Sequence, residues 1–245
     1  MKCVILIHGF LSDHHDLDSI KPALENIYDH IECIDLPGHG IHYKKERFNV
    51  DKVLDFINNL YKKLEKDYDE IDCIGYSMGG ALALYLASKQ KIRKLILLAP
   101  ACKYLNFLFP YKRLKTYLHT KKALSKSMSG NIKESLKEKL KNIHKDDLIA
   151  LKFLKDRYFT IKFPAYFIEF RKLIKNINSS IENISTPTLL LYGHIDQIIP
   201  EKAIEFVYNV CENVKTIIYS DISHLMLLSK DCGKIVDDIL DFIKD

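Results

Sequence analysis

One serine stands in a setting that suits nucleophilic chemistry. Ser77 lies within GYSMGG (residues 75–80), after the apolar run IDCIGY and before the helical run ALALYLAS. Glycines on both sides of a serine allow a strand and the next helix to approach closely, so the serine sits on a tight, strained turn. The first N–H groups of such a helix also face developing negative charge. The pattern predicts Ser77 as a nucleophile.

Two later segments supply a base and an acid. Near neutral pH a serine hydroxyl needs a base to take its proton, and the base needs a group that fixes its tautomer. The run TLLLY continues into GHIDQIIP, which puts Asp196 beyond the end of a strand. The run KTIIYS continues into DISHLMLL, which puts His224 beyond the last strand. We expect His224 as general base and Asp196 as the acid that orients it.

Other residues of the same types compete for these roles. Asp35 and Asp221 also follow expected strands. In folds that carry the serine on such a turn, the acid and then the base follow it along the chain, which excludes Asp35. Asp221 is so close to His224 that a cap of the local turn is its simpler role. Three further histidines fall in helical or linking segments and are expected at the surface: His30, His119 and His144.

Acyl-transfer chemistry also needs donors aimed at the developing oxyanion. One is the N–H of the residue after the nucleophile, here Met78. The other comes from the loop after an earlier strand, and VILIHGF ends such a strand with His8, Gly9 and Phe10. We expect the Phe10 N–H as this second donor, with Gly9 allowing the backbone to approach the substrate.

A group of potential metal ligands follows this loop in SDHHDLD, namely Asp13, His14, His15, Asp16 and Asp18. Their spacing matches no standard ligand pattern. Ser12 or Asp13 followed by acidic residues also describes the start of a helix. We therefore expect no metal at this group. The chemistry expected of Ser77, His224 and Asp196 requires neither a metal nor an organic cofactor.

Apolar runs alternate with helical patterns along most of the chain. Continuous apolar runs are typical of a parallel sheet that is covered on both faces. We expect strands at residues 3–7, 31–36, 71–76, 94–99, 188–192 and 215–219, and helices at 17–28, 50–68, 78–89, 201–211 and 234–244. The predicted fold class is α/β, with a mainly parallel sheet of about six strands flanked by helices.

One long interval lacks a strand pattern. Residues 101–184 contain only amphipathic helical segments, so we expect an α/β core at 1–100 and 185–245 with an inserted helical cap between them. Such an insertion would cover the edge where ligands bind in open α/β sheets. Its segments YLNFLFPY and RYFTIKFPAYF would either line an acyl pocket or simply pack the cap onto the core.

Composition limits the class of protein. The 245 residues are 47% hydrophobic and 28% charged, as in ordinary globular chains. A net charge of +5 is modest, and most lysines fall at helical spacing, so nucleic acid is not an expected partner. No apolar stretch approaches the roughly 18 residues that span a bilayer. We expect a cytoplasmic protein without a stable membrane anchor.

Five motifs in this order resemble the α/β-hydrolase family: HGF, DLPGHG, GYSMGG, GHIDQIIP and SHLML. The similarity is greatest to small carboxylesterases and monoacylglycerol-lipase-like enzymes with a helical cap. It implies hydrolysis of small-molecule esters of short to medium acyl chains through an acyl-enzyme on Ser77. The first strand begins almost at Met1, so the antiparallel strands that open many family members look absent.

GYSMGG and DLPGHG are also similar to the menaquinone-pathway synthase that eliminates pyruvate with the same three catalytic residue types. Those relatives carry an arginine after the glycine pair, where this chain has Ala81. Arg113, Arg157 or Arg171 would have to replace it. A thioesterase, an amidase and a non-enzymatic binding protein of the same fold are further alternatives.

Overall fold

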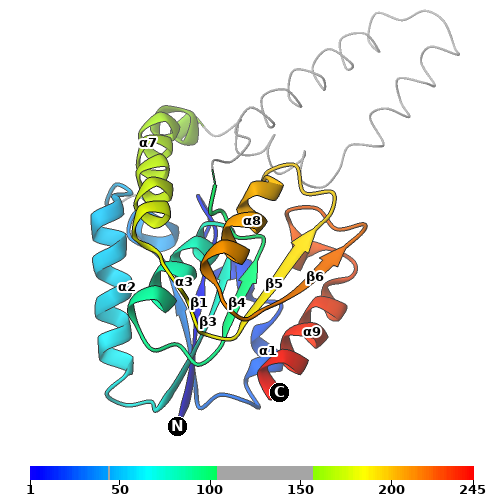
Figure 1. The fold of residues 1–245 in the computed structure, drawn as a ribbon. Helices are drawn as coiled ribbons and strands as arrows, with labels where there is room; N and C mark the ends of the chain where they lie inside the picture. The colour runs from blue at the N-terminus through cyan, green and yellow to red at the C-terminus, as the bar shows by residue number, and fades with distance from the viewer. Residues whose placement is uncertain (44, 104–156) are drawn as a thin grey trace, which may run out of the picture. The chain divides into compact units, whose positions relative to one another are not determined.

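Six strands form one wholly parallel sheet in the computed structural model, which describes residues 1–43, 45–103 and 157–245 (Figure 1). The strand order is β2-β1-β3-β4-β5-β6. The strands are β1 Lys2–Ile7, β2 His30–Ile34, β3 Glu70–Tyr76, β4 Leu95–Leu98, β5 Thr188–Gly193 and β6 Val214–Tyr219. All six expected strands are present within two residues of the predicted bounds, and the predicted fold class is confirmed.

The sequence of each strand matches its place in the sheet. The central strands β4 and β5 are buried at every position, because helices cover both of their faces. The edge strand β6 mixes exposed and half-buried positions with one buried residue, Tyr219. Since all strands run the same way, their carboxyl ends lie together at one end of the sheet. The loops that follow these carboxyl ends carry the predicted site.

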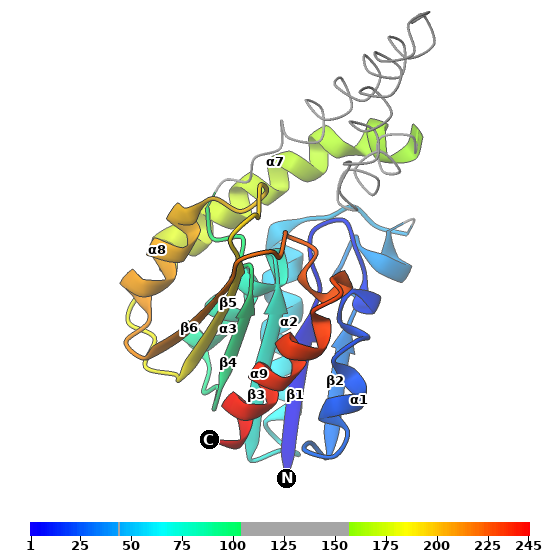
Figure 2. The same cartoon turned by 90° about the vertical axis from the view of Figure 1, so that its right-hand side faces the viewer.

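Helices cover the two faces of the sheet. Helices α1 (Lys21–Leu24) and α9 (Cys232–Lys244) lie on one face, and α2 (Val50–Leu64), α3 (Met78–Lys89) and α8 (Glu201–Val210) on the other (Figure 2). The remaining described helices are α7 (Arg157–Ser180) and the short 3₁₀ helices η1 (His14–Leu17), η2 (Gly40–His42) and η3 (Met226–Leu228). The predicted bounds hold within two residues for α3, α8 and α9, whereas α2 begins as predicted but ends at Leu64, four residues before the expected end at 68.

The helix expected at residues 17–28 is largely wrong. The structure has a 3₁₀ turn, η1, and then only the four residues of α1. Ile20 precedes α1 without a side-chain cap, and Pro22 lacks the N–H that a longer helix would need at that point. The apolar spacing of this segment instead serves to bury Leu17, Ile20 and Leu24.

The chain divides into two compact units, Met1–Leu105 with Ala165–Asp245, and Asn106–Pro164. Most of the cap expected at 101–184 lies outside the described residues, so its boundaries stay a prediction. Within the first unit, α7 is tied to the loop after β2: the Tyr166 hydroxyl donates to the Gly38 carbonyl at 2.7 Å, and Glu169 accepts from the Val50 N–H at 3.0 Å. Among the helices described, none has the length and apolarity to cross a membrane.

A buried carboxylate fastens the start of β3, the strand that leads to Ser77. The Asp72 side chain is fully buried and accepts hydrogen bonds from the Tyr28 hydroxyl, the Arg93 guanidinium and the Lys94 N–H. Burial raises the pKa of Asp72, and its bonds with Tyr28 and Arg93 oppose that rise. The network joins β3 to the turn before β2, which carries Tyr28, and to the segment before β4, which carries Arg93 and Lys94.

We expect Arg93→Met to lower the free energy of unfolding by about 3–5 kcal/mol, because it leaves the Asp72 carboxylate buried without its cation. Urea denaturation of the wild type and the variant measures the difference. The double variant Arg93→Met with Asp72→Asn is the control and should regain part of the loss. A loss below about 1 kcal/mol in the single variant would show that the pair is not a structural requirement.

His39 is a buried histidine with an unusual environment. Its side chain is packed among the rings of His8, Phe48 and Tyr166, at centroid distances of 5.5, 4.8 and 5.7 Å. Its Nδ1 lies 3.3 Å from the Pro37 carbonyl, while Nε2 has no hydrogen-bond partner among the described residues. Burial, with a smaller effect from His8, lowers the pKa of His39 from 6.5 to about 3.

This histidine makes stability depend on pH. In the unfolded chain His39 binds a proton near pH 6.5, whereas in the folded protein it stays neutral down to about pH 3. Protonation of the unfolded state therefore lowers the free energy of unfolding as the pH falls through this window, by up to about 1.4 kcal/mol per pH unit. His39→Phe should reduce the slope of the free energy of unfolding against pH by this amount. Denaturant titrations between pH 3 and 7 measure that slope. Equal slopes for both proteins would contradict the assignment.

Candidate active site

Ser77 lies on a sharp turn between β3 and α3. Its φ of 55° and ψ of −115° place it in a region that non-glycine residues rarely adopt. A Cβ on Gly75 would meet the backbone of Gly79, and one on Gly79 would meet the carbonyl oxygen of Ile7 in β1. Glycine is required at both positions for the close approach of strand and helix, as the sequence pattern suggested.

The structure joins the three residues that the sequence singled out. The His224 Nε2 lies 3.1 Å from the Ser77 Oγ, and the His224 Nδ1 lies 2.9 Å from the Asp196 Oδ2. The second carboxylate oxygen of Asp196 accepts the N–H groups of Ile198 and Ile199 at 2.8 and 3.0 Å. These bonds fix the carboxylate, which in turn orients the imidazole.

Burial sets the electrostatics of this chain of hydrogen bonds. Side-chain exposure is 8% for His224 and 0% for Asp196, and Ser77 is 4% exposed. In a buried site a carboxylate interacts more strongly with an adjacent imidazolium than it would in water. The arrangement can therefore stabilise a proton on His224 when Ser77 loses its own.

The competing aspartates lie elsewhere. Asp35 accepts hydrogen bonds from the backbone N–H and the ring of His14, both at 2.9 Å, and from the Ile41 N–H. Asp221 is exposed and accepts from the Ser220 hydroxyl. Of the three aspartates considered from sequence, Asp196 is the one that bonds to His224.

Sequence reasoning missed the contribution of Tyr76. Its hydroxyl donates to the His224 carbonyl at 3.0 Å, and its ring stacks near the imidazole at a centroid distance of 5.3 Å. Tyr76 therefore ties the loop after β6 to the turn that carries Ser77. Its position directly before Ser77 was the one available signal, since no pattern in the sequence links it to residue 224.

The loop after β1 lies next to the nucleophile. Strands β1 and β3 are adjacent, with Ile7 opposite Gly75, so their carboxyl ends emerge side by side. A Cβ on Gly9 would come 3.4 Å from the Cβ of Ser77. On the other side of Ser77, Met78 begins α3, and the first N–H groups of a helix have no partner within it. Gly9 thus lies beside Ser77 in space and Met78 follows it in the chain, so the two expected donors come from different elements.

His8 fixes the peptide group that carries the Phe10 N–H. The His8 Nε2 accepts the Leu36 N–H at 3.0 Å, so the ring proton is on Nδ1, which donates to the Gly9 carbonyl at 2.7 Å. Burial lowers the pKa of His8, which keeps the ring neutral. In a trans peptide C=O and N–H point in opposite directions. The bond to the Gly9 carbonyl therefore turns the Phe10 N–H away from His8.

Aromatic side chains hold the Phe10 ring from several elements. Its centroid lies 4.9 Å from that of Phe170 on α7, and the rings of His39, Phe48 and Tyr166 follow at 6.0, 5.9 and 6.4 Å. Phe170 and Tyr166 are buried. The segment YLNFLFPY and the side chains of residues 157–163 lie outside the described residues, so their predicted contribution to a pocket stays a prediction.

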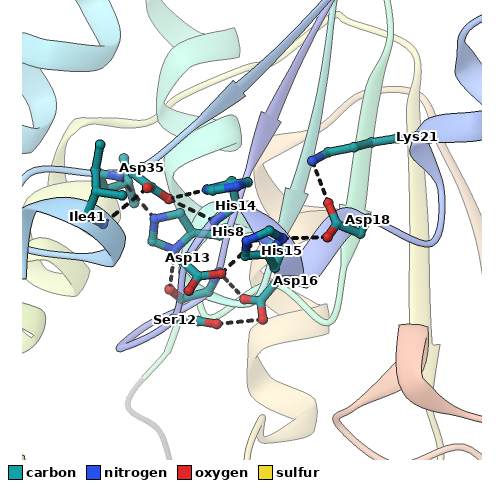
Figure 3. A network of polar contacts seen from close by, with 12 residues as sticks. His8, Ser12, Asp13, His14, His15, Asp16, Asp18, Lys21, Asp35 and Ile41 are labelled. Carbon is teal, nitrogen blue, oxygen red and sulfur yellow. Dashed lines mark hydrogen bonds and ion pairs between the residues drawn. The ribbon is translucent and has the colours of Figure 1, made fainter.

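One group of side chains has the composition of a metal site. Asp13, His14 and His15 each offer a donor atom, and these atoms lie within 4.8 Å of one another. The same residues have other partners: Asp13 caps η1 through the His15 N–H, and the Nδ1 atoms of His14 and His15 bond to Asp35 and Asp18 (Figure 3). These bonds account for the cluster, and we assign no metal to it.

Two relatives with curated names match most of the chain. A putative esterase/lipase 3 of Mycoplasma pneumoniae is 29% identical over 209 residues, which cover 82% of this chain and 71% of the relative. A pimeloyl-[acyl-carrier protein] methyl ester esterase of Neisseria meningitidis is 25% identical over 237 residues, covering 94% and 89%.

Solved structures show the same fold. The monoacylglycerol lipase of Paleococcus ferrophilus superimposes with a TM-score of 0.66 at 14% identity, covering 98% of this chain and 93% of that one. The sequence profile described as alpha/beta hydrolase fold matches residues 2–231. That match includes the nucleophile turn, both loops that carry Asp196 and His224, and the Gly9–Phe10 loop. The chain therefore belongs to the α/β-hydrolase family.

Proposed function

We propose that this protein is a carboxylic ester hydrolase that works through an acyl-enzyme on Ser77. The hydrogen-bonded chain Asp196–His224–Ser77 carries the proposal. The substrates we propose are esters of short to medium acyl chains, with monoacylglycerols among them. The names of the relatives support ester hydrolysis, since both matched proteins are called esterases.

The acylation step follows from the tautomer of His224. Its Nδ1–H donates to Asp196, which leaves Nε2 as the acceptor for the Ser77 hydroxyl proton. The Ser77 Oγ forms a bond to the ester carbonyl carbon while its proton moves to Nε2. The tetrahedral intermediate then collapses, the bond to the alcohol oxygen breaks, and the leaving alcohol takes the proton from His224.

Deacylation repeats these steps with water in place of Ser77. His224 takes a proton from water, the hydroxide oxygen bonds to the acyl carbon, and Ser77 leaves with the proton that His224 returns. In both halves the carbonyl oxygen carries negative charge. We propose the Phe10 and Met78 N–H groups as its donors, because Gly9 lies against Ser77 and Met78 begins the helix that follows it.

Replacement of the nucleophile tests this proposal first. Ser77→Ala should lower kcat for p-nitrophenyl esters by about 10⁶-fold and abolish covalent labelling by a fluorophosphonate, because no other hydroxyl lies at the His224 Nε2 in the described structure. Hydrolysis is followed by absorbance and labelling by intact mass. Ser88→Ala, on the far turn of α3, is the matched control and should keep both activities.

A substrate panel with the wild-type protein separates ester hydrolysis from the alternative activities. It contains p-nitrophenyl esters of increasing acyl length, a monoacylglycerol, an acyl thioester and a methyl ester of a pimeloyl thioester, the last chosen from the Neisseria relative. A wild type that is labelled at Ser77 yet hydrolyses no oxygen ester would replace the proposal by a thioesterase, an amidase or the pyruvate elimination. A wild type that is neither labelled nor active would overturn acyl transfer altogether.

Replacement of the orienting acid, Asp196, should have a different effect on kcat from replacement of Ser77. Asp196→Asn keeps the size of the side chain but favours the wrong tautomer of His224, so kcat should fall by about 10⁴-fold with little change in the melting temperature. Steady-state kinetics and thermal unfolding measure the two quantities. Asp221→Asn serves as the control, because that side chain is exposed and bonds only to Ser220 among the described contacts. Similar losses in both variants would argue against Asp196 as the orienting acid.

A further inference from the structure

A carboxylate with no part in the steps above lies directly against the Gly9–Phe10 turn. The Asp16 Oδ2 accepts the Gly9 N–H at 3.0 Å, and its Oδ1 accepts the Ser12 hydroxyl at 2.6 Å (Figure 3). The backbone of Asp16 is itself fixed in η1, where its N–H donates to the Asp13 carbonyl at 3.1 Å. One side chain thus bonds to residues on both sides of Phe10 and Leu11.

The turn between these two anchor points is strained. Leu11 has a φ of 60°, in the left-handed region that a leucine seldom adopts. Such a residue costs on the order of 1–3 kcal/mol and keeps its conformation only where its surroundings enforce it. The bonds of Asp16 to Gly9 and Ser12 bracket Leu11, so they are placed to hold the strained turn.

The turn lies between Asp16 and the nucleophile. A Cβ on Gly9 would come 3.2 Å from the Asp16 Oδ2 and 3.4 Å from the Ser77 Cβ. A small movement of this backbone would therefore change the direction of the Phe10 N–H relative to Ser77. Misplacement by about 1 Å can cost a reaction roughly 100-fold.

The far end of the loop has its own anchors. The Gly40 N–H donates to the Ser12 carbonyl at 3.2 Å. The His14 N–H donates to Asp35 at 2.9 Å, as Figure 3 shows. These bonds tie residues 12–14 to the loop after β2. Asp16 extends the same support to Gly9, at the end of the loop that faces the nucleophile.

We propose that Asp16 is a positioning residue for the oxyanion site. It holds the turn at residues 9–12 so that the Phe10 N–H stays aimed at the carbonyl oxygen of the substrate. The inference rests on the proposed ester hydrolysis and goes beyond it, because Asp16 bonds to the turn and to none of Ser77, His224 and Asp196 in the described contacts. A carboxylate suits this role because it accepts from an N–H and a hydroxyl at once.

The test compares three variants with the wild type. In Asp16→Ala, kcat for p-nitrophenyl esters should fall by about 10- to 100-fold, while KM changes by no more than about twofold, since the lost interaction acts on the transition state. Asp16→Asn has the same shape and one acceptor oxygen, so it should regain most of kcat. Asp18→Ala is the matched control: this half-exposed acid of the same loop bonds to His15 and Lys21 and should keep wild-type kinetics.

A second readout separates positioning from general stability. A boronic acid that forms a tetrahedral adduct with Ser77 presents an oxygen where the oxyanion forms. Its affinity should fall in Asp16→Ala by the same factor as kcat/KM, with melting temperatures of all variants close to the wild type. A merely structural role would lower the melting temperature and leave the inhibitor affinity of the folded fraction unchanged.

The outcomes distinguish this inference from the function on which it rests. If the wild type is labelled and hydrolyses esters while Asp16→Ala keeps its kcat, Asp16 has no positioning role and the proposed function stands. If the wild type is neither labelled nor active, both proposals are wrong. Should Asp16→Ala fail to fold, Ser12→Ala decides: it removes the bond to Oδ1 alone and should lower kcat several-fold, and an unchanged kcat would overturn the inference.

Discussion

Ser77 is held at φ 55°, a conformation that costs a non-glycine residue about 1–3 kcal/mol, and both of its peptide groups are bonded to other segments. Its N–H donates to the Leu98 carbonyl at 2.9 Å, and its carbonyl accepts the Ala101 N–H at 2.9 Å. Residues at and just beyond the end of β4 therefore fix the turn at the end of β3. The strain at Ser77 persists because the packed sheet enforces it.

The other parts of the site also lie at the carboxyl ends of the strands. β1 lies beside β3 and brings the Gly9–Phe10 turn next to the serine, while β5 and β6 lie side by side and bring Asp196 to His224. A Cβ on Gly193 would meet the Ile222 carbonyl, so the two loops touch where β5 ends. Strand order thus decides which of these loops can meet.

The sequence was sufficient for those features that rest on local pattern. Apolar runs predicted all six strands, and the glycines of GYSMGG predicted the turn, because each of these depends on residues within a few positions of one another. The contacts of Tyr76, His8 and Asp16 were not predictable, since each is a side-chain bond that exists only once loops from different strands have met. The helix expected at 17–28 failed for a local reason: apolar spacing fits a succession of short turns as well as it fits one helix.

Described residues on both sides of positions 104–156 contact the site. The Ala101 N–H donates to the Ser77 carbonyl, and Tyr166 and Phe170 of α7 pack against the Phe10 ring. The bonds that hold Ser77, His224 and Asp196 come from the sheet and its loops and do not involve α7. Substitution of Tyr166 or Phe170 can therefore alter the surroundings of the Phe10 ring while the hydrogen-bonded chain stays intact. The described contacts thus separate the residues that carry the proposed chemistry from the aromatic residues that surround the Phe10 ring beside it.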